Sequence, residues 1–199
     1  MITVEEAYSR RAGEYTALLG SMEAVHPSDR QLVVTWAESV TGRILDAGCG
    51  PGHWTHHLAR RGHPVRGIDL ALPLVSSARR SYPDVPFSVA SIDDIDEPDA
   101  SLGGILSWYS TIHHAPDRIT RPFSEFARTI RSGGTLLVGY FAGESLAPFD
   151  HVVAPAYQWP DREMHAMVRD HGFDVVESHR RAGPGHRPHG AAVCRRVER

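Results

Sequence analysis

The segment from Arg43 to Thr55 constrains the fold of this chain more than any other. An apolar run that begins at Ile44 ends in the carboxylate of Asp46, and three glycines then alternate with other residues before a helical pattern begins. This order predicts a buried strand, a tight turn and the start of a helix. Glycine permits the sharp turn and lets a ligand approach the backbone without meeting a Cβ atom. Because the amides at a helix start can bind an anionic group, we expect a ligand site at this turn.

The spacing of the glycines argues against a dinucleotide site. A G-x-G-x-x-G motif that begins at Gly48 would need its third glycine at His53, and one that begins at Gly50 would need it at Thr55. The carboxylate of Asp46 would also repel a pyrophosphate. A ligand with an ammonium group and a carboxylate fits better, and the methionine part of S-adenosylmethionine carries both.

A second acid supports this interpretation. Asp69 closes the next apolar run, which covers residues 65–68. An acidic side chain at the end of the second strand of such a unit accepts hydrogen bonds from ribose hydroxyls. The sequence therefore favours S-adenosylmethionine over NAD as the ligand.

The composition narrows the class of protein. A chain of 199 residues is long enough for one domain with a substantial core, and a net charge of −3 gives no basic field that would attract nucleic acid or an anionic membrane. The sequence shows neither a membrane-spanning apolar stretch nor a signal-peptide pattern, and its two cysteines do not indicate a disulfide framework. The absence of lysine excludes a Schiff-base mechanism. We expect a soluble, cytoplasmic protein, a monomer or homodimer, that acts on a small molecule without nucleic-acid or membrane partners.

Hydrophobic periodicity predicts alternating strands and helices. The expected helices cover residues 4–19, 28–39, 53–61, 73–82, 117–130 and 160–171. The expected strands cover residues 43–47, 64–68, 86–89, 104–108, 135–141, 173–177 and 191–197. Strands separated by helices at this spacing predict βαβ units and a parallel sheet. The last two strands have only a loop over residues 180–190 between them, so we expect them to be antiparallel neighbours.

Three stretches resemble the motifs of class I S-adenosylmethionine-dependent methyltransferases that act on small molecules (methyltransferase type 11-like). Residues 44–55 resemble the first motif, residues 67–69 the second, and residues 132–138 the turn into the fifth strand. The resemblance implies an α/β fold with a Rossmann-like, doubly wound sheet of seven strands. In this family the sheet is mostly parallel with an antiparallel last strand, in the order 3-2-1-4-5-7-6. One domain would span residues 1–199, with residues 1–40 as N-terminal helices that cover the cofactor cleft and residues 41–199 as the core.

The resemblance also implies which residues hold the ligands. S-adenosyl-L-methionine would be the methyl donor, with S-adenosyl-L-homocysteine as product. The expected cofactor contacts are Tyr15, Asp46, Gly48, Cys49, Gly50, Trp54, Asp69, Leu70, Ser91, Ile92 and Trp108. The expected acceptor contacts are Tyr109, His114, Tyr157 and Trp159. Ser91 stands where the family often has an acid, with Asp93 as the alternative contact to the adenine.

The segment after the fourth predicted strand, residues 108–116, is the expected place of the chemistry. It lacks the Asp/Asn-Pro-Pro-aromatic motif of base-modifying relatives, and the chain has no asparagine for the metal site of catechol-type relatives, so we expect no metal. Histidine suits a general base because its pKa lies near neutrality. His113 is therefore the expected catalytic base, and the neighbouring His114 is expected to point away from the reacting atoms.

Two alternatives to methyl transfer stay open. The protein could bind the cofactor and carry out other chemistry, such as a cyclisation or rearrangement, or it could be an accessory subunit without an acceptor pocket. The acceptor molecule and the atom that receives the methyl group, whether oxygen, nitrogen or carbon, also stay open.

Overall fold

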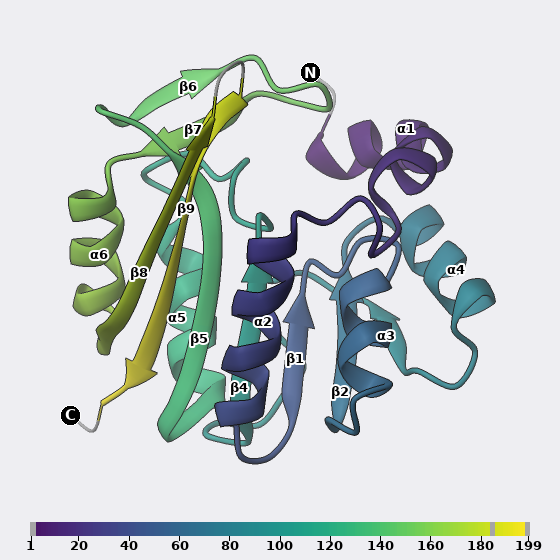
Figure 1. Ribbon diagram of the computed structural model, residues 1–199, viewed down its shortest axis with the longest axis horizontal. Helices are drawn as coiled ribbons and strands as arrows, with labels where there is room; N and C mark the ends of the chain where they lie inside the picture. Colours follow the sequence, from purple (N-terminus) through teal and green to yellow (C-terminus); the bar gives the residue numbers. More distant parts are fainter. Residues whose placement is uncertain (1–2, 184–185, 198–199) are drawn as a thin grey trace.

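Nine strands form one mixed sheet with helices on both faces in the computed structural model, which describes residues 3–183 and 186–197 (Figure 1). The strands are β1 (Ile44–Ala47), β2 (Val65–Asp69), β3 (Phe87–Val89), β4 (Leu102–Trp108), β5 (Ile130–Ala142), β6 (Ala147–Phe149), β7 (Ala156–Trp159), β8 (Phe173–Gly183) and β9 (His186–Arg196). The helices are α1 (Val4–Leu19), α2 (Pro27–Ser39), α3 (His53–Ala59), α4 (Leu72–Ser81), α5 (Thr120–Thr129) and α6 (Asp161–Asp170). Across these described ranges, no helix has the length and apolar character needed to cross a lipid bilayer.

The order of the strands places the switch point of the sheet beside β1. The parallel strands follow the order β3-β2-β1-β4-β5. Beyond β5, β9 pairs antiparallel with β5, and β8 pairs antiparallel with β9. Because β8 and β9 are the predicted sixth and seventh strands, the predicted order 3-2-1-4-5-7-6 is confirmed.

The hairpin of β8 and β9 corrects the expected loop over residues 180–190. The two strands extend through most of this stretch, of which residues 184–185 lie outside the described part of the chain. Arg181 pairs with His189 across the hairpin, and His189 pairs with Phe141 of β5. Because β9 finds backbone partners on both sides, these bonds outweigh the low strand propensity of its glycine and proline.

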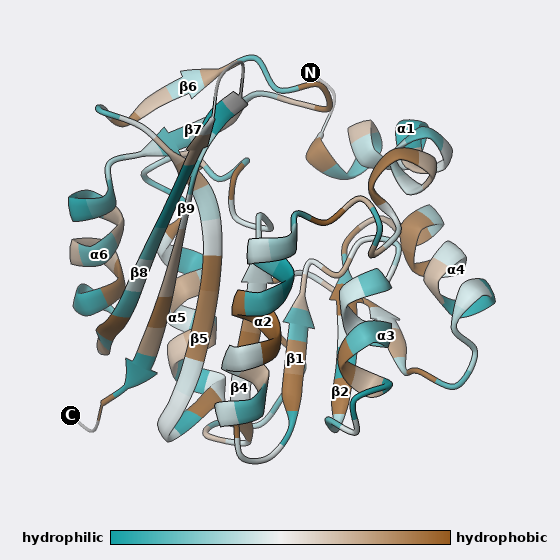
Figure 2. Ribbon diagram, viewed as in Figure 1, coloured by the Kyte–Doolittle hydropathy of each residue, from teal (hydrophilic) through white to brown (hydrophobic). Residues whose placement is uncertain are grey.

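The inner strands are buried on both faces, so neighbouring residues alternate between two cores. Ile44 and Leu106 pack in the core formed with α2 and α3, whereas Leu45 and Ile105 pack in the core formed with α5 and α6. Figure 2 shows the hydrophobic colour along β1, β2 and β5 between these helices. Each such side chain stabilises the fold by about 1.5–3 kcal/mol, and together they fix the strand ends that carry the site.

Helix α1 lies beyond the carboxyl ends of the parallel strands (Figure 1). A capping box begins it, in which the side chains of Thr3 and Glu6 each accept a hydrogen bond from the other residue's backbone amide. The buried residues of α1 are Ala7 and Ala12. The helix therefore rests on the domain through a narrow apolar face.

Candidate active site

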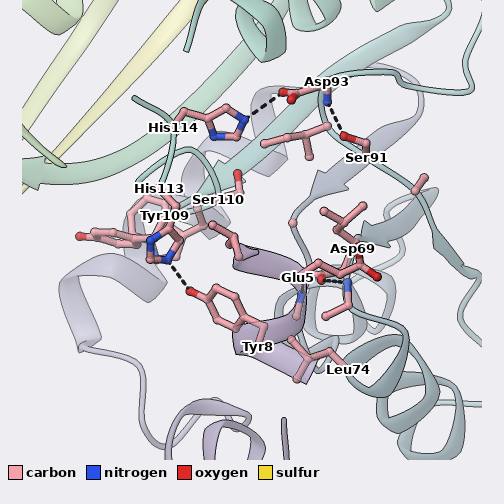
Figure 3. A pocket seen from close by; sticks show the side chains of 18 of the residues that line it. Glu5, Tyr8, Asp69, Leu74, Ser91, Asp93, Tyr109, Ser110, His113 and His114 are labelled. Carbon is pink, nitrogen blue, oxygen red and sulfur yellow. Dashed lines mark hydrogen bonds and ion pairs between the residues drawn. The ribbon is translucent and has the colours of Figure 1, made fainter. Parts of the chain in front are cut away.

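A cavity of about 450 Å³ lies at the carboxyl ends of the parallel strands, between α1 and the sheet (Figure 3). Its walls come from α1, the glycine turn after β1, the end of β2, and the segments after β3 and β4. This volume is in the range of small-molecule sites. The position is also the one where open α/β sheets bind ligands, at the switch point of the strand order.

The glycine turn after β1 brings bare backbone to the cavity. Gly48 and Gly50 line it, with left-handed φ angles of +84° and +54°. A Cβ atom on Gly48 would lie 2.3 Å from Cβ of Ser110, so a side chain cannot fit there without displacing its neighbour. The amides of Gly48 and Cys49 each donate to the carbonyl of Ile68 at 2.8 Å. The turn is therefore anchored to β2 on one side and open to the cavity on the other.

Asp69 ends β2 next to this turn and lines the cavity. Its Oδ2 accepts a hydrogen bond from the amide of Gly50 at 2.9 Å, and its Oδ1 accepts one from the amide of Ala71 at 2.8 Å. Burial raises the pKa of Asp69, against the lowering effect of these amides. The two bonds fix the carboxylate, and each oxygen keeps a second lone pair that can accept a hydrogen bond from a ligand hydroxyl.

Other predicted cofactor contacts surround Asp69. Leu70 follows β2, Ser91 and Ile92 follow β3, and Trp108 ends β4, and all of them line the same cavity. Tyr15 reaches it from α1. The structure thus combines apolar walls with a few oriented polar groups, which is the usual make-up of a small-molecule site.

Three predicted cofactor contacts lie outside the cavity lining and support the turn instead. Asp46 is buried and accepts a hydrogen bond from Oγ1 of Thr55 at 2.6 Å, and burial raises its pKa to about 7. Cys49 is buried, and Trp54 packs edge-on against Trp108 with ring centroids 6.1 Å apart. Each side chain points into the packed interior, and direct ligand contact by Asp46, Cys49 and Trp54 stays a prediction.

The segment after β4 brings both neighbouring histidines to the cavity. The amide of His114 donates to the carbonyl of Thr111 at 3.0 Å, so the chain turns here. In a turn, unlike in an extended strand, consecutive side chains need not point to opposite sides. This geometry corrects the expectation that His114 points away from the site of His113.

The two histidines have different partners. Nδ1 of His113 lies 2.9 Å from the carbonyl oxygen of Pro155, and its Nε2 lies 3.0 Å from the hydroxyl of Tyr8. Burial lowers the pKa of His113, which favours its neutral form. Nε2 of His114 lies 2.9 Å from Oδ1 of Asp93 (Figure 3).

Comparisons with known proteins bear on this arrangement. A family model described as a methyltransferase domain matches residues 44–134, the range that includes the glycine turn and both histidines. Malonyl-[acyl-carrier protein] O-methyltransferase of Serratia marcescens is 28% identical over 167 residues, which cover 81% of this chain and 60% of that relative. Over these residues the chain is similar to methyltransferases.

Other relatives match over shorter stretches or in fold. Ubiquinone biosynthesis O-methyltransferase of Xanthomonas axonopodis pv. citri is 31% identical over 121 residues, covering 59% of this chain and 50% of the relative. The chain thus spans about half to three fifths of the length of these two relatives.

Two solved structures share the fold. The 1,6-didemethyltoxoflavin-N1-methyltransferase of Burkholderia thailandensis, with bound 1,6-didemethyltoxoflavin and S-adenosylhomocysteine, has a TM-score of 0.77 at 19% identity and covers 98% of this chain and 90% of its own. The [4+2]-cyclase SpnF has a TM-score of 0.80 at 17% identity, with coverage of 98% and 95%. At these identities the likeness establishes the fold alone.

Tyr109, an expected acceptor contact, lines the cavity in a left-handed conformation, with φ +59°. Its hydroxyl is hydrogen-bonded to Nδ1 of His189 on β9, and its ring lies 5.2 Å from that of Phe141. A non-glycine residue keeps such a φ only where its surroundings hold it. The end of β4 and the hairpin therefore fix the Tyr109 ring together.

Tyr157 and Trp159, the other expected acceptor contacts, lie outside the cavity lining. Trp159 pairs with Ala142 of β5 and is 6% exposed within the core beside α6. Tyr157 packs against the same core. Because β7 joins the sheet, both residues lie beside the core, and their contact with an acceptor stays a prediction.

Sequence reasoning does not select three residues that line the cavity, namely Tyr8, Ser110 and Arg118. The seven-residue spacing of Tyr8 from Tyr15 puts both on one face of α1, which is a usable signal. Ser110 lies within residues 108–116, the segment where the chemistry is expected, whereas Arg118 lies beyond it without a local pattern, so only the fold reveals Arg118.

Proposed function

We propose that this protein transfers a methyl group from S-adenosylmethionine to a small-molecule acceptor. The observation that carries the proposal is one continuous cavity that joins the glycine turn and Asp69 to the histidines after β4. The similarity to methyltransferases supports the same reaction. The acceptor atom, oxygen, nitrogen or carbon, is not part of this first proposal.

The residues present fit the cofactor. The turn at Gly48 and Gly50 offers bare backbone where the methionine part would lie, and Asp69 offers two oriented oxygens to the ribose. Leu70 and Ile92 supply apolar walls for the adenine. When bound, S-adenosylmethionine would supply a methyl group attached to a cationic sulfur. The sulfur would keep the carbon–sulfur electron pair and leave as a neutral thioether.

The protein's own part in such a reaction is alignment and exclusion of water. Tyr8 and Tyr15 of α1 pack edge-on, with ring centroids 5.4 Å apart, and both line the cavity. They cover the space between the cofactor residues and the segment after β4. Holding two reactants in line within a dry site lowers the barrier to transfer.

A methyl-transfer screen tests the proposal. The purified protein is incubated with S-adenosylmethionine and a panel of phenols, alcohols, carboxylic acids and amines, and S-adenosylhomocysteine is measured together with methylated product. We expect stoichiometric formation of the two with at least one acceptor class. Conversion of an acceptor without S-adenosylhomocysteine would point to cyclisation or rearrangement, and binding without any conversion would point to an accessory role. Gly48→Val, which blocks the turn, is the matched inactive control.

A further inference from the structure

Strand β8 forms one end of the mixed sheet. It pairs with β9 over Phe173–Gly183, and no other strand among residues 3–183 and 186–197 pairs with it. Figure 1 shows β8 at the opposite end of the sheet from β2. A strand in this position presents a row of backbone amides and carbonyls to which a further strand can bind.

The helices beside β8 contact its two faces. The hydroxyl of Ser178 lies 3.2 Å from a histidine ring of α6, and Arg180 pairs at 3.1 Å with an aspartate of the same helix. Alternate residues of a strand share a face, so α6 lies on one face of β8. On the other face Arg181 pairs with Asp29 of α2 at 2.7 Å. Residues 176–180 are nonetheless exposed, so neither helix covers the strand.

The charges of β8 are segregated along the strand. Asp174 and Glu177 lie in its first half, and His179, Arg180 and Arg181 lie in its second half. Charged side chains usually protect an exposed edge from further pairing, because a second strand would bring like charges together. This pattern does not protect β8 from an antiparallel copy of itself, because the acidic half of each strand then faces the basic half of the other.

A two-fold axis through the middle of β8 gives such a pairing. Two identical strands related by this axis run antiparallel, and the contact closes on itself as a dimer. Residues 177–181 lie between two register shifts and pair regularly with β9, which makes them the straight part of the edge. With the axis at His179, Glu177 lies directly opposite Arg181 of the second copy. Opposite charges in this position stabilise a strand pair.

The contact of Arg181 with α2 leaves room for this bond. Asp29 accepts hydrogen bonds from Nε and Nη2 of the guanidinium. Nη1 carries further hydrogens and can donate to a carboxylate of the second copy. The side chain of Glu177 is 59% exposed, so its carboxylate can reach across the edge.

We propose that β8 is the interface between two copies of this chain, which pair antiparallel through residues 177–181 and join their sheets. The proposal narrows the expectation of a monomer or homodimer to a homodimer, and it does not depend on methyl transfer. A strand pair of this length buries less surface than the about 1,200–2,000 Å² of a stable interface. We therefore expect a weak dimer with a dissociation constant of roughly 1–100 μM.

Sedimentation velocity on the full chain over that concentration range measures the association. We expect monomer at the lower end and dimer at the upper end. Hydrogen-exchange mass spectrometry then locates the contact. Exchange within residues 177–181 should slow where the dimer is populated, whereas exchange in β2, at the other end of the sheet, should stay the same. A chain that stays monomeric throughout, or a dimer in which residues 177–181 exchange as fast as in the monomer, would overturn the proposal.

Charge reversal tests the antiparallel register. Glu177→Arg should raise the dissociation constant by about tenfold or more, because like charges then face each other twice across the axis. Arg181→Glu should do the same when it is combined with Asp29→Asn, which keeps the new carboxylate from facing an acid of α2. Glu38→Arg makes the same change in net charge at an exposed position of α2 and should associate as the parent does.

An equimolar mixture of the two reversed proteins completes the test. Each should be monomeric alone at concentrations where the parent is a dimer, and the mixture should recover the dimer, because every reversed side chain then faces an opposite charge. Thermal unfolding establishes that both proteins are folded. Folded variants that stay monomeric when mixed would overturn the antiparallel pairing. Parental association of Glu177→Arg would place the interface elsewhere and would also overturn it.

Discussion

At the scale of single residues, the two acids near the glycine turn occupy opposite environments. Asp69 lines the cavity and keeps lone pairs for a ligand, whereas Asp46 is closed off and bonded to Thr55. The backbone at Gly48 has both kinds of role, because the residue faces the cavity while its amide is hydrogen-bonded to β2. Substitutions here should therefore affect binding and stability separately.

Asp69→Ala should weaken S-adenosylhomocysteine binding. Hydrogen bonds to a charged group are worth about 1.5–3 kcal/mol, which corresponds to a dissociation constant about 10- to 150-fold higher. Isothermal titration calorimetry measures it, with Asp84→Ala, an exposed acid outside the cavity lining, as control. Equal affinity in Asp69→Ala and the parent would contradict the role of Asp69 toward ribose.

Gly48→Ala should cost more stability than Gly62→Ala, although both positions have a left-handed φ, +84° and +87°. At Gly62 an added Cβ meets nothing within 4 Å, so only the backbone strain of about 1–2 kcal/mol applies. At Gly48 the added Cβ also collides with Ser110. Urea unfolding compares the two variants. Equal losses would mean that Ser110 moves aside freely.

Asp46 should make the protein less stable as the pH rises from about 4 to 7. Burial raises its pKa to about 7 in the folded chain, against about 3.9 when unfolded. Between these values the folded state holds the proton more tightly, so raising the pH favours unfolding by up to about 1.4 kcal/mol per unit. Urea unfolding across this window should show the decline in the parent and a flatter profile in Asp46→Asn. Identical profiles would show that Asp46 ionises freely in the folded state.

The sequence predicts the cavity-facing roles of Gly48 and Asp69 because glycine spacing and a strand-ending acid are local signals. It places His114 at the site but does not give the direction of its ring, because a turn closed by Thr111 decides where that side chain points. It also does not reveal the burial of Asp46, because the direction of its carboxylate depends on a bond to Thr55 from the following helix. Local pattern places a residue at the site, but tertiary contacts decide whether it faces the ligand.

At the scale of elements, α1 packs on the body through few buried apolar side chains. Its contacts with the body are a small cluster around Ala12 and Leu74, the Tyr8–His113 hydrogen bond, and a hydrogen bond from Arg11 to the carbonyl of Val152. Few buried apolar contacts give an element low local stability.

Tyr8→Phe should speed amide hydrogen exchange in α1 by about fivefold, since a lost neutral hydrogen bond is worth about 1 kcal/mol. Exchange in β1 and β4 should be unchanged, because their cores do not involve Tyr8. Hydrogen-exchange mass spectrometry resolves the segments. Tyr157→Phe makes the same chemical change away from the cavity and should leave α1 as in the parent. If α1 exchanged no faster in Tyr8→Phe, the bond to His113 would not hold the helix.

The elements of the parallel sheet are predictable because each strand carries its own apolar run and each helix its own periodicity. The pair β6 and β7 is not, since both strands are short and Pro148 interrupts the pattern of the first. The composition of residues 180–190 predicts a loop, yet most of them form strands because β8 pairs with β9 and β9 pairs with β5. Long-range pairing overrides local propensity at this edge of the sheet.

At the scale of the whole molecule, cofactor binding should raise the thermal stability of the entire domain, because the site joins α1, the glycine turn and the ends of three parallel strands. A ligand at a hundred times its dissociation constant adds about 2.7 kcal/mol to the free energy of unfolding. For a chain of this size that is a rise in Tm of about 5–10 °C. S-adenosylhomocysteine should produce this shift in a thermal unfolding assay, and NAD at the same concentration should not, because the glycine spacing does not match a dinucleotide motif. Gly48→Val should abolish the shift even where the variant still unfolds cooperatively. A Tm that rises with NAD and ignores S-adenosylhomocysteine would overturn the cofactor assignment.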